Sequence, residues 1–378
     1  MNIKKDLVSW FLKNAVIPNL IDLNTPGFIV VKQNWKGETI NQRNVFYSEK
    51  FLANLEKSLH DSLGEEGDKI AYSIGINYGS AYCNSFAIPR LGFDSEKSID
   101  DFIVFYSAFM GVTWGEFFDY SYDLKEKSAW IEFGNHIVCN KNGLGYAFTS
   151  GNVGGGWQYM MQDKSVQSTQ TQCIGLGAKT CKVIMGPASY LDKLGLKHFN
   201  EQAKISFKLD ETYLEMNKPK KLSYSNASMH KLISVGFFDF TDNKLSLNND
   251  RYCFTGAELL YVSELLSLEH EELGKIIFDA GFEQGKEIAT AEKENDYSTF
   301  IPDLISALGF GDVLISKTKN SFEIETNYFP YLENYDKIKY FYYRGLLSGL
   351  LTGFTGKKIN FEKFEVDVSN GYLKVHLW

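Results

Sequence analysis

The chain carries one order of sequence features twice, and this duplication limits its fold more than any other feature. From Phe28 the order is a short apolar strand, an Arg-x-x-Phe segment (Arg43 to Phe46), a helix, a helix with Gly-x-x-x-Gly (Gly75, Gly79), an aromatic-Gly-acid turn (114–116) and a closing hairpin. From Phe238 the order recurs with Arg251 to Phe254, Gly281 with Gly285, a turn at 310–312 and a hairpin ending at Trp378. A repeat of about 208 residues is a folding unit rather than a solenoid turn, so we predict two similar domains that form a pseudo-symmetric intramolecular dimer.

Hydrophobic periodicity predicts an α+β fold for each copy. Apolar residues at three-four spacing indicate a helix that Ser48 caps and Gly64 ends, and Thr255 with Glu258 forms a capping box before the matching helix. The paired glycines are costly inside a helix, so we expect them at a close backbone approach to a neighbouring helix or a ligand. Alternating residues after each aromatic-Gly turn predict antiparallel strands, with the helices on one face of the sheet. The predicted organisation is an N-terminal helix (1–25), a first domain (26–188), a tether with helical content (189–234) and a second domain (235–378).

Composition argues against several classes of protein. The net charge is −8 and the longest basic cluster (218–221) contains a proline, so no nucleic-acid partner is expected. The apolar stretch near the N-terminus (7–12) is too short to span a membrane and lacks a cleavage site. Five scattered cysteines do not form a secreted disulfide framework. We therefore expect a cytoplasmic protein with reduced thiols.

The hairpin of the first copy resembles the closing signature of the 4-vinyl-reductase domain family. Gln170, Cys173, Gly177 and Cys181 follow that signature in spacing, and the preceding Arg, Gly-x-x-x-Gly, Trp-Gly and Gly-rich segments occur in the family's order. The resemblance covers both copies and implies small-molecule-binding domains, related in fold to vesicle-tethering subunits and found in aromatic-sensing transcription activators. Such domains typically pair as dimers. Here both members of the pair would lie on one chain.

The same resemblance implies a zinc site in the first copy. In metal-bearing relatives the ligands are a Cys before the Gly-rich helix, an acid and the two hairpin cysteines. Cys173 and Cys181 are present, Gln170 replaces the acid, Ala147 stands before the helix, and Cys139 lies eight residues too early unless the loop is longer here. The alternative is two buried thiols without metal. The second copy has Glu362, Glu365 and Leu373 at the corresponding positions and is expected to be degenerate, without metal.

The family's pocket lies between the helices and the sheet, under the aromatic-Gly turn. Matching positions give the predicted lining residues Trp114, Phe109, Trp130, Tyr146 and Trp157 in the first copy and Phe310 in the second. An indole N–H in an apolar cavity can donate to a ligand oxygen, which suits phenol-like or carbonyl compounds. The alternative is that Trp114 is a core aromatic.

No catalytic residues are predicted, because none of the six histidines lies in a recognised catalytic pattern. His136, near Cys139, is the best histidine candidate for a ligand or metal contact. The leading hypothesis is a non-enzymatic sensor or carrier that holds a hydrophobic or aromatic ligand in the first copy and signals to a protein partner. An enzyme or accessory factor acting on a tetrapyrrole vinyl group and a structural assembly subunit are the alternatives.

Overall fold

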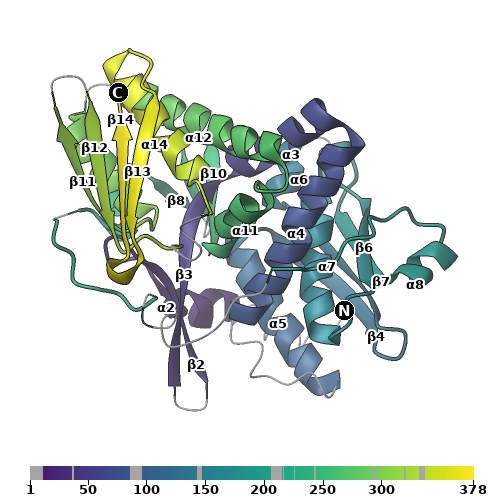
Figure 1. Cartoon of the computed structure of the whole chain (residues 1–378). Helices are drawn as coiled ribbons and strands as arrows, with labels where there is room; N and C mark the ends of the chain where they lie inside the picture. The colour runs from purple at the N-terminus through teal and green to yellow at the C-terminus, as the bar shows by residue number, and fades with distance from the viewer. Residues whose placement is uncertain are drawn as a thin grey trace.

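The structure, a computed structural model, combines helices with three antiparallel sheets (Figure 1). It describes residues 12–35, 38–85, 96–142, 147–205, 215, 217–224, 226–241, 244–292, 295–318, 321–331 and 337–378. In the first half the elements are η1 (Leu12–Val16), α2 (Ile17–Leu20), β1 (Ile21–Asp22), β2 (Ile29–Trp35), β3 (Glu38–Ser48), α3 (Glu49–Leu63), α4 (Glu65–Ser85), α5 (Glu96–Thr113), β4 (Glu116–Asp123), β5 (Ser128–Gly134), α6 (Ile137–Asn142), α7 (Ala147–Met161), β6 (Val166–Gln172), η3 (Ile174–Leu176) and β7 (Cys181–Pro187). The remaining elements are α8 (Ala188–Lys193), α10 (Met229–Ser234), β8 (Asp239–Thr241), β9 (Lys244–Leu247), β10 (Asp250–Gly256), α11 (Glu258–Leu266), α12 (Glu271–Ala291), α13 (Tyr297–Ala307), β11 (Asp312–Lys317), β12 (Phe322–Asn327), α14 (Phe341–Thr355), β13 (Phe361–Asp367), η4 (Val368–Asn370) and β14 (Tyr372–Leu377).

The two halves of the chain share one sheet and each has a second sheet of its own. The shared sheet has the order β1-β2-β3-β10-β9-β8, and its central pair places Phe46 directly opposite Phe254. The other two sheets have corresponding orders, β4-β5-β7-β6 and β11-β12-β14-β13, and lie on opposite sides of Figure 1. The α+β class is therefore as predicted. The sequence did not indicate the shared sheet, because strand pairing between distant segments leaves no local pattern.

Glycines bring two helix pairs into backbone contact. A Cβ added to Gly151 or Gly155 of α7 would lie 2.2 Å from Tyr72 O or 2.0 Å from Ile76 O of α4. In the second half, a Cβ on Gly345 or Gly349 of α14 would meet backbone oxygens of α12 at 2.2 and 2.0 Å. Of the two predicted reasons for the glycine spacing, close approach to a neighbouring helix is the one observed.

The predicted N-terminal cap is present on α3 in the first half and absent from α11 in the second half. The Ser48 side chain accepts a hydrogen bond from Phe51 N, so the predicted cap of α3 is confirmed. The predicted capping box of Thr255 and Glu258 is wrong: α11 begins at Glu258 without a side-chain cap, and the Thr255 hydroxyl contacts Tyr78 OH of α4. The Thr255 hydroxyl is therefore engaged in the contact between the two halves and does not cap α11.

Buried glutamates hold the starts of the glycine helices. Glu56 of α3 accepts hydrogen bonds from Ala147 N at 2.7 Å and Phe148 N at 3.2 Å. Glu264 of α11 accepts from Lys339 N at 3.2 Å, just before α14. Each carboxylate satisfies backbone N–H groups near a helix N-terminus, where negative charge is favoured. Burial raises the pKa of Glu264 to about 7.

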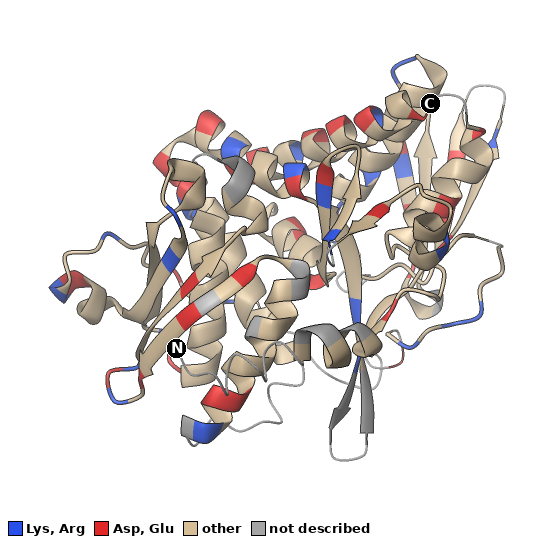
Figure 2. Ribbon diagram, turned by 180° about the vertical axis from the view of Figure 1, so that it is seen from behind, with Lys and Arg blue, Asp and Glu red and all other residues tan. Residues whose placement is uncertain are grey.

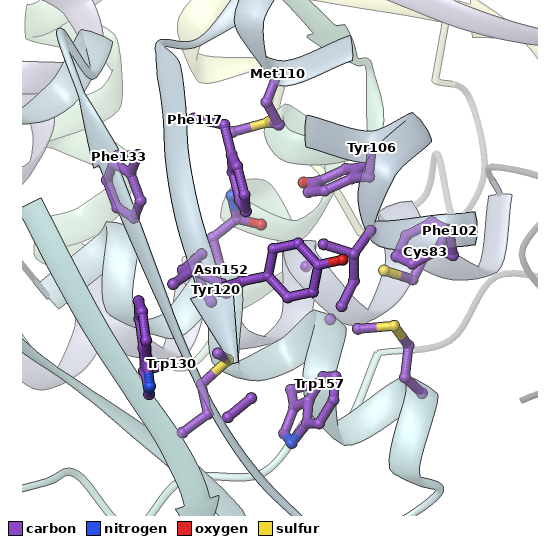
Figure 3. Close-up of a pocket in the computed structure, with 18 of the residues that line it drawn as sticks. Cys83, Phe102, Tyr106, Met110, Phe117, Tyr120, Trp130, Phe133, Asn152 and Trp157 are labelled. Atoms are coloured by element: carbon purple, nitrogen blue, oxygen red, sulfur yellow. The ribbon is translucent and has the colours of Figure 1, made fainter. Parts of the chain in front are cut away.

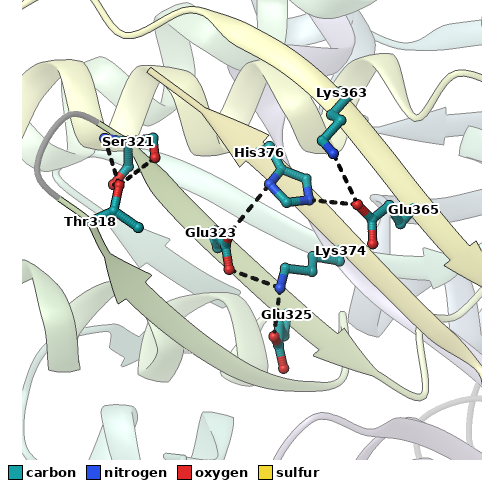
Figure 4. Close-up of polar contacts among 8 residues, drawn as sticks. All are labelled: Thr318, Ser321, Glu323, Glu325, Lys363, Glu365, Lys374 and His376. Carbon is teal, nitrogen blue, oxygen red and sulfur yellow. Dashed lines mark hydrogen bonds and ion pairs between the residues drawn. The ribbon is translucent and has the colours of Figure 1, made fainter.

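The outer face of the β11-β12-β14-β13 sheet carries an ion-pair lattice (Figure 4). Lys374 lies 2.8 Å from Glu323 and 3.0 Å from Glu325, and His376 lies 3.1 Å from Glu365. Glu365 therefore belongs to a surface network, while Leu373 is fully buried on the other face. Acidic and basic residues are interspersed along the ribbon in Figure 2.

The segment between the halves contacts both of them. In its described part, the backbone N–H groups of Lys204 and Ile205 donate to Asn77 of α4 at 2.7 and 2.9 Å. Farther along, Ser223 N donates to Asp312 of β11 at 2.7 Å. Of the predicted N-terminal helix, residues 1–11 lie outside the described residues, and helical structure is present from Leu12 to Leu20. No described helix is long and apolar enough to cross a membrane.

The contact between the α7 glycines and the α4 backbone gives a prediction, and Gly156 of the same helix provides the control. Gly155→Ala should lower the free energy of unfolding by about 2–4 kcal/mol, because the added methyl collides with the α4 backbone. Gly156→Ala should be neutral or stabilising by up to about 1 kcal/mol, since its Cβ would meet only Cys83 Sγ at 3.3 Å and alanine favours a helix. Urea unfolding measures both. Equal losses in the two variants would contradict the contact.

Glu264 gives a pH prediction. Its pKa in the folded protein, about 7, lies above the reference value of 4.5, so the folded state holds the proton to higher pH. The contribution of Glu264 to the free energy of unfolding is complete below about pH 4.5 and is lost as the pH rises through about 7, where the folded protein releases the proton. Between pH 5 and 8 the wild type should therefore lose about 2–3 kcal/mol relative to Glu264→Gln. Urea unfolding across this range is the measurement, with the exposed Glu269→Gln as control; parallel pH profiles of wild type and Glu264→Gln would contradict the assignment.

Candidate ligand cavity and thiol cluster

The first half contains a cavity between its helices and its own sheet (Figure 3). Its volume is about 80 Å³, several times the roughly 10–15 Å³ that one water requires. Helices α4, α5 and α7 supply one side and strands β4 and β5 the other. The lining is mostly aromatic, aliphatic and sulfur-containing: Gly79, Cys83, Phe102, Ile103, Tyr106, Met110, Gly115, Phe117, Tyr120, Ser121, Ala129, Trp130, Ile131, Phe133, His136, Asn152, Val153, Gly156, Trp157, Met160 and Met185.

Small side chains on α7 account for this space. Gly151 and Gly155 face α4, whereas Gly156 and Asn152 line the cavity. The corresponding positions of α14, counted from its Gly345 and Gly349, are Leu350 and Leu346. Both leucines are fully buried, so larger side chains occupy the core of the second half at these positions.

Hydrogen bonds fix the aromatic walls. Trp157 Nε1 donates to Lys127 O at 2.9 Å, so its indole N–H already has an acceptor. The hydroxyls of Tyr120 and Tyr122 donate to Asp100 at 3.1 and 3.2 Å, which ties β4 to α5. The ammonium of Lys182 lies 4.1 Å from the Trp130 ring centroid. The wall is therefore organised before any ligand binds.

His136 is a buried polar residue in this lining. It is 3% exposed, and its ring centroid lies 4.8 Å from that of Phe133 and 5.7 Å from that of Trp114. Its Nδ1 has no hydrogen-bond partner among the described residues. Burial, followed by the nearby Arg251 cation, lowers the pKa of His136 to about 3. A neutral imidazole with an unused nitrogen offers a hydrogen bond to an uncharged ligand.

The structure separates the predicted pocket residues into groups. Trp130 and Trp157 line the cavity. Trp114 and Phe109 are buried beside it without belonging to the lining: Trp114 stacks on Phe148 at 6.2 Å, and Phe109 meets Phe254 edge to face at 5.8 Å. Tyr146 lies outside the described residues.

Phe310 lies in the second half, away from this cavity. Its ring packs 6.0 Å from Phe329 and 6.1 Å from Tyr342. Trp114, His136 and Phe148 form a ring group in the first half.

The predicted lining includes Phe109 of α5 but not the face of this helix that lines the cavity. Phe102, Tyr106 and Met110 recur every four residues on this helix and all line the cavity. That spacing was a usable signal for one helix face. It could not reveal whether the face met a filled core or a cavity.

Three cysteines meet beside the cavity. Cys139 comes from α6, Cys173 follows β6 and Cys181 begins β7; all three are buried, and their sulfur atoms lie within 4.8 Å of one another. Gln170 joins them, with Nε2 3.4 Å from Cys139 Sγ. Helix α6 supplies the connection that makes the early sequence position of Cys139 compatible with the cluster. None of the five cysteines, all of which lie in the described part of the chain, forms a disulfide.

The cluster has the chemistry of a metal site. Hydrogen bonds from the Cys139 and Cys181 thiols, with backbone N–H groups in the η3 turn, lower the pKa of Cys173. A thiolate is the form of cysteine that binds metal ions. Three sulfur donors at this separation can hold a thiophilic metal, with a fourth position open to a side chain or water.

Comparisons with known proteins give distant structural likeness alone. No family model and no curated protein matches the chain. Among solved structures, the chain is similar to the phenol-responsive sensory domain of the transcription activator PoxR, determined with phenol. The match has 17% sequence identity and a TM-score of 0.35, and it covers 52% of this chain and 97% of that one. Membership of the 4-vinyl-reductase family therefore stays a prediction.

The cluster of Cys139, Cys173 and Cys181 predicts metal binding, and variants of each cysteine test which of them are ligands. Metal-free protein should take up about one Co²⁺ per chain and develop a thiolate-to-cobalt absorption band. Serine at position 139, 173 or 181 should each weaken Co²⁺ binding by about tenfold or more, because one of three donors is lost. Cys253→Ser, which removes a buried thiol outside the cluster, is the control. An equal loss in the control, or no absorption band in the wild type, would contradict the site.

Proposed function

We propose that this protein is a small-molecule sensor or carrier that holds a hydrophobic or aromatic ligand in the cavity of its first half. The observation that carries the proposal is a mostly apolar cavity of about 80 Å³, walled by Trp130 and Trp157 and lined by His136, whose Nδ1 has no hydrogen-bond partner within the described part of the chain. Apolar walls with few polar groups are typical of small-molecule sites. A compact, uncharged aromatic compound with one hydrogen-bonding group fits this lining.

The size of the cavity separates this proposal from its enzymatic alternative. A tetrapyrrole is a macrocycle of four joined rings and is much larger than a space of about 80 Å³. Only an edge group of such a molecule would enter. A purely structural assembly subunit has no need of the cavity, and packed side chains would be more stable there.

We infer that the chain is a pseudo-symmetric pair of related domains, with boundaries near residues 26–188 and 235–378. Phe46 and Phe254, which face each other in the shared sheet, are about 208 residues apart, and so are the capping residues Glu56 and Glu264. The corresponding strand orders support the same pairing. The leucines that replace Asn152 and Gly156 support assigning ligand binding to the first domain and a scaffolding role to the second.

We further propose that the thiol cluster holds zinc. Cys139, Cys173 and Cys181 would be the ligands, and Gln170 Oε1, which lies 3.9 Å from Cys139 Sγ, or a water would complete four-coordination. Zinc at this position would supply a structural cross-link. The residues themselves join α6 to the β6–β7 hairpin, next to the cavity wall that His136 forms.

A cavity-filling pair tests the ligand proposal. Val153→Phe should keep or raise the melting temperature, because the ring occupies empty space, and should abolish binding of small aromatics. Leu347→Phe, at the corresponding position of α14, should lower stability by about 1–3 kcal/mol, since Leu347 is fully buried in a filled core. Thermal shift and calorimetry with phenol, indole and toluene are the measurements.

Two results would overturn the proposal. One is an unchanged affinity for these compounds in Val153→Phe. The other is a wild-type protein that shows no thermal shift with the panel and no retained small molecule by native mass spectrometry after purification from its own host.

A further inference from the structure

One short turn of the first half joins the cavity wall to the thiol cluster. Residues 134–137 connect β5, whose Phe133 lines the cavity, to α6, which carries Cys139. His136 of this turn lines the cavity, and Ile137 N donates to Trp114 O at 2.8 Å. Displacement of the turn would therefore move a cavity wall and a thiol together.

The second half of the chain supplies the side chain that holds this turn. Arg251 of β10 donates from Nη1 to Asn135 O at 2.9 Å, and its Nη2 lies 3.4 Å from Glu49 at the start of α3. The side chain of Arg251 is 14% exposed and that of Glu49 is 4% exposed. A charge-assisted hydrogen bond in such a shielded position is stronger than one in water.

We propose that Arg251 is a positioning residue that couples the second half of the chain to the ligand cavity. Its guanidinium, oriented by Glu49, fixes the 134–137 turn and thereby the placement of His136. By linkage, a ligand that orders the turn also stabilises the contact between the halves, which is how occupancy of the cavity would reach the second half. The ligand part rests on the function proposed above; the positioning part does not.

The pseudo-symmetric arginine makes a different contact. Arg43 of β3 donates to Gly27 O at 2.7 Å and Gly309 O at 3.1 Å and lies over the Phe28 ring. It is 2% exposed, and both of its acceptors are backbone carbonyls. Arg251, which contacts the half that contains the cavity, thus differs from Arg43 in having a carboxylate partner, Glu49, and partial access to solvent.

Hydrogen exchange and binding together test the proposal on the full-length chain. In Arg251→Met, amide exchange within 131–142 should accelerate about tenfold in ligand-free protein, and affinity for phenol or indole should fall about tenfold. Arg251→Lys should give intermediate values, since lysine keeps the charge but cannot donate to Asn135 and Glu49 in the same planar arrangement. Lys50→Met is the matched control. It removes the Lys50–Glu287 pair (2.8 Å), which also joins the halves but does not contact the turn.

The outcomes separate the two proposals. Faster exchange confined to 131–142, with Lys50→Met unchanged, supports the positioning role even if neither compound binds the wild type, in which case only the ligand proposal fails. Unchanged exchange in this segment, or equal acceleration across the whole chain, overturns the positioning role. If Arg251→Met does not fold, the same comparison is made with Arg251→Lys.

Discussion

Backbone contact between two glycine-bearing helices is the constraint on which the rest of the structure depends. Gly151 and Gly155 let α7 lie against α4 at a distance that no other residue permits. The orientation of α7 is then fixed, and its other face turns Asn152 and Gly156 toward the sheet. Because these side chains are small, the helix and sheet do not meet there, and the cavity follows. In the second half, the glycines of α14 make the same kind of helix contact, and the residues at the positions of Asn152 and Gly156 are Leu346 and Leu350, both fully buried.

The shared sheet explains how two such units act as one molecule. The last five residues of β3 (44–48) pair with residues 252–256 of β10, so each unit supplies hydrogen-bond partners to an edge that would otherwise be open. Side chains from one unit can then reach the other, as Tyr78 does to Thr255 and Arg251 does to Asn135. The interiors of the two halves differ: α7 has Asn152 and Gly156 where α14, aligned on its glycines, has Leu346 and Leu350.

Local sequence signals predicted much of the fold and part of the candidate site. The glycine spacing, the Ser48 cap and the α+β class are local properties, and the structure agrees with them. The Thr255 capping box was wrong because a tyrosine of the other unit engages that hydroxyl. The position of Cys139 depends on α6, whose path the sequence does not indicate. Trp114 shows a further limit: ring stacking and cavity lining favour the same residue type, and only three-dimensional packing distinguishes them.

The most direct measurement is ¹⁹F NMR, under xenon pressure, of protein labelled with 5-fluorotryptophan. Xenon enters dry apolar cavities whatever natural ligand they bind, so the test does not require the ligand to be known. Trp130 and Trp157 line the cavity, whereas Trp378 is 58% exposed at the C-terminus. The account predicts saturable shifts of the Trp130 and Trp157 resonances with little change at Trp378. No shift at those two resonances, or a uniform non-saturating drift of all signals, would contradict a ligand-sized cavity in the first half.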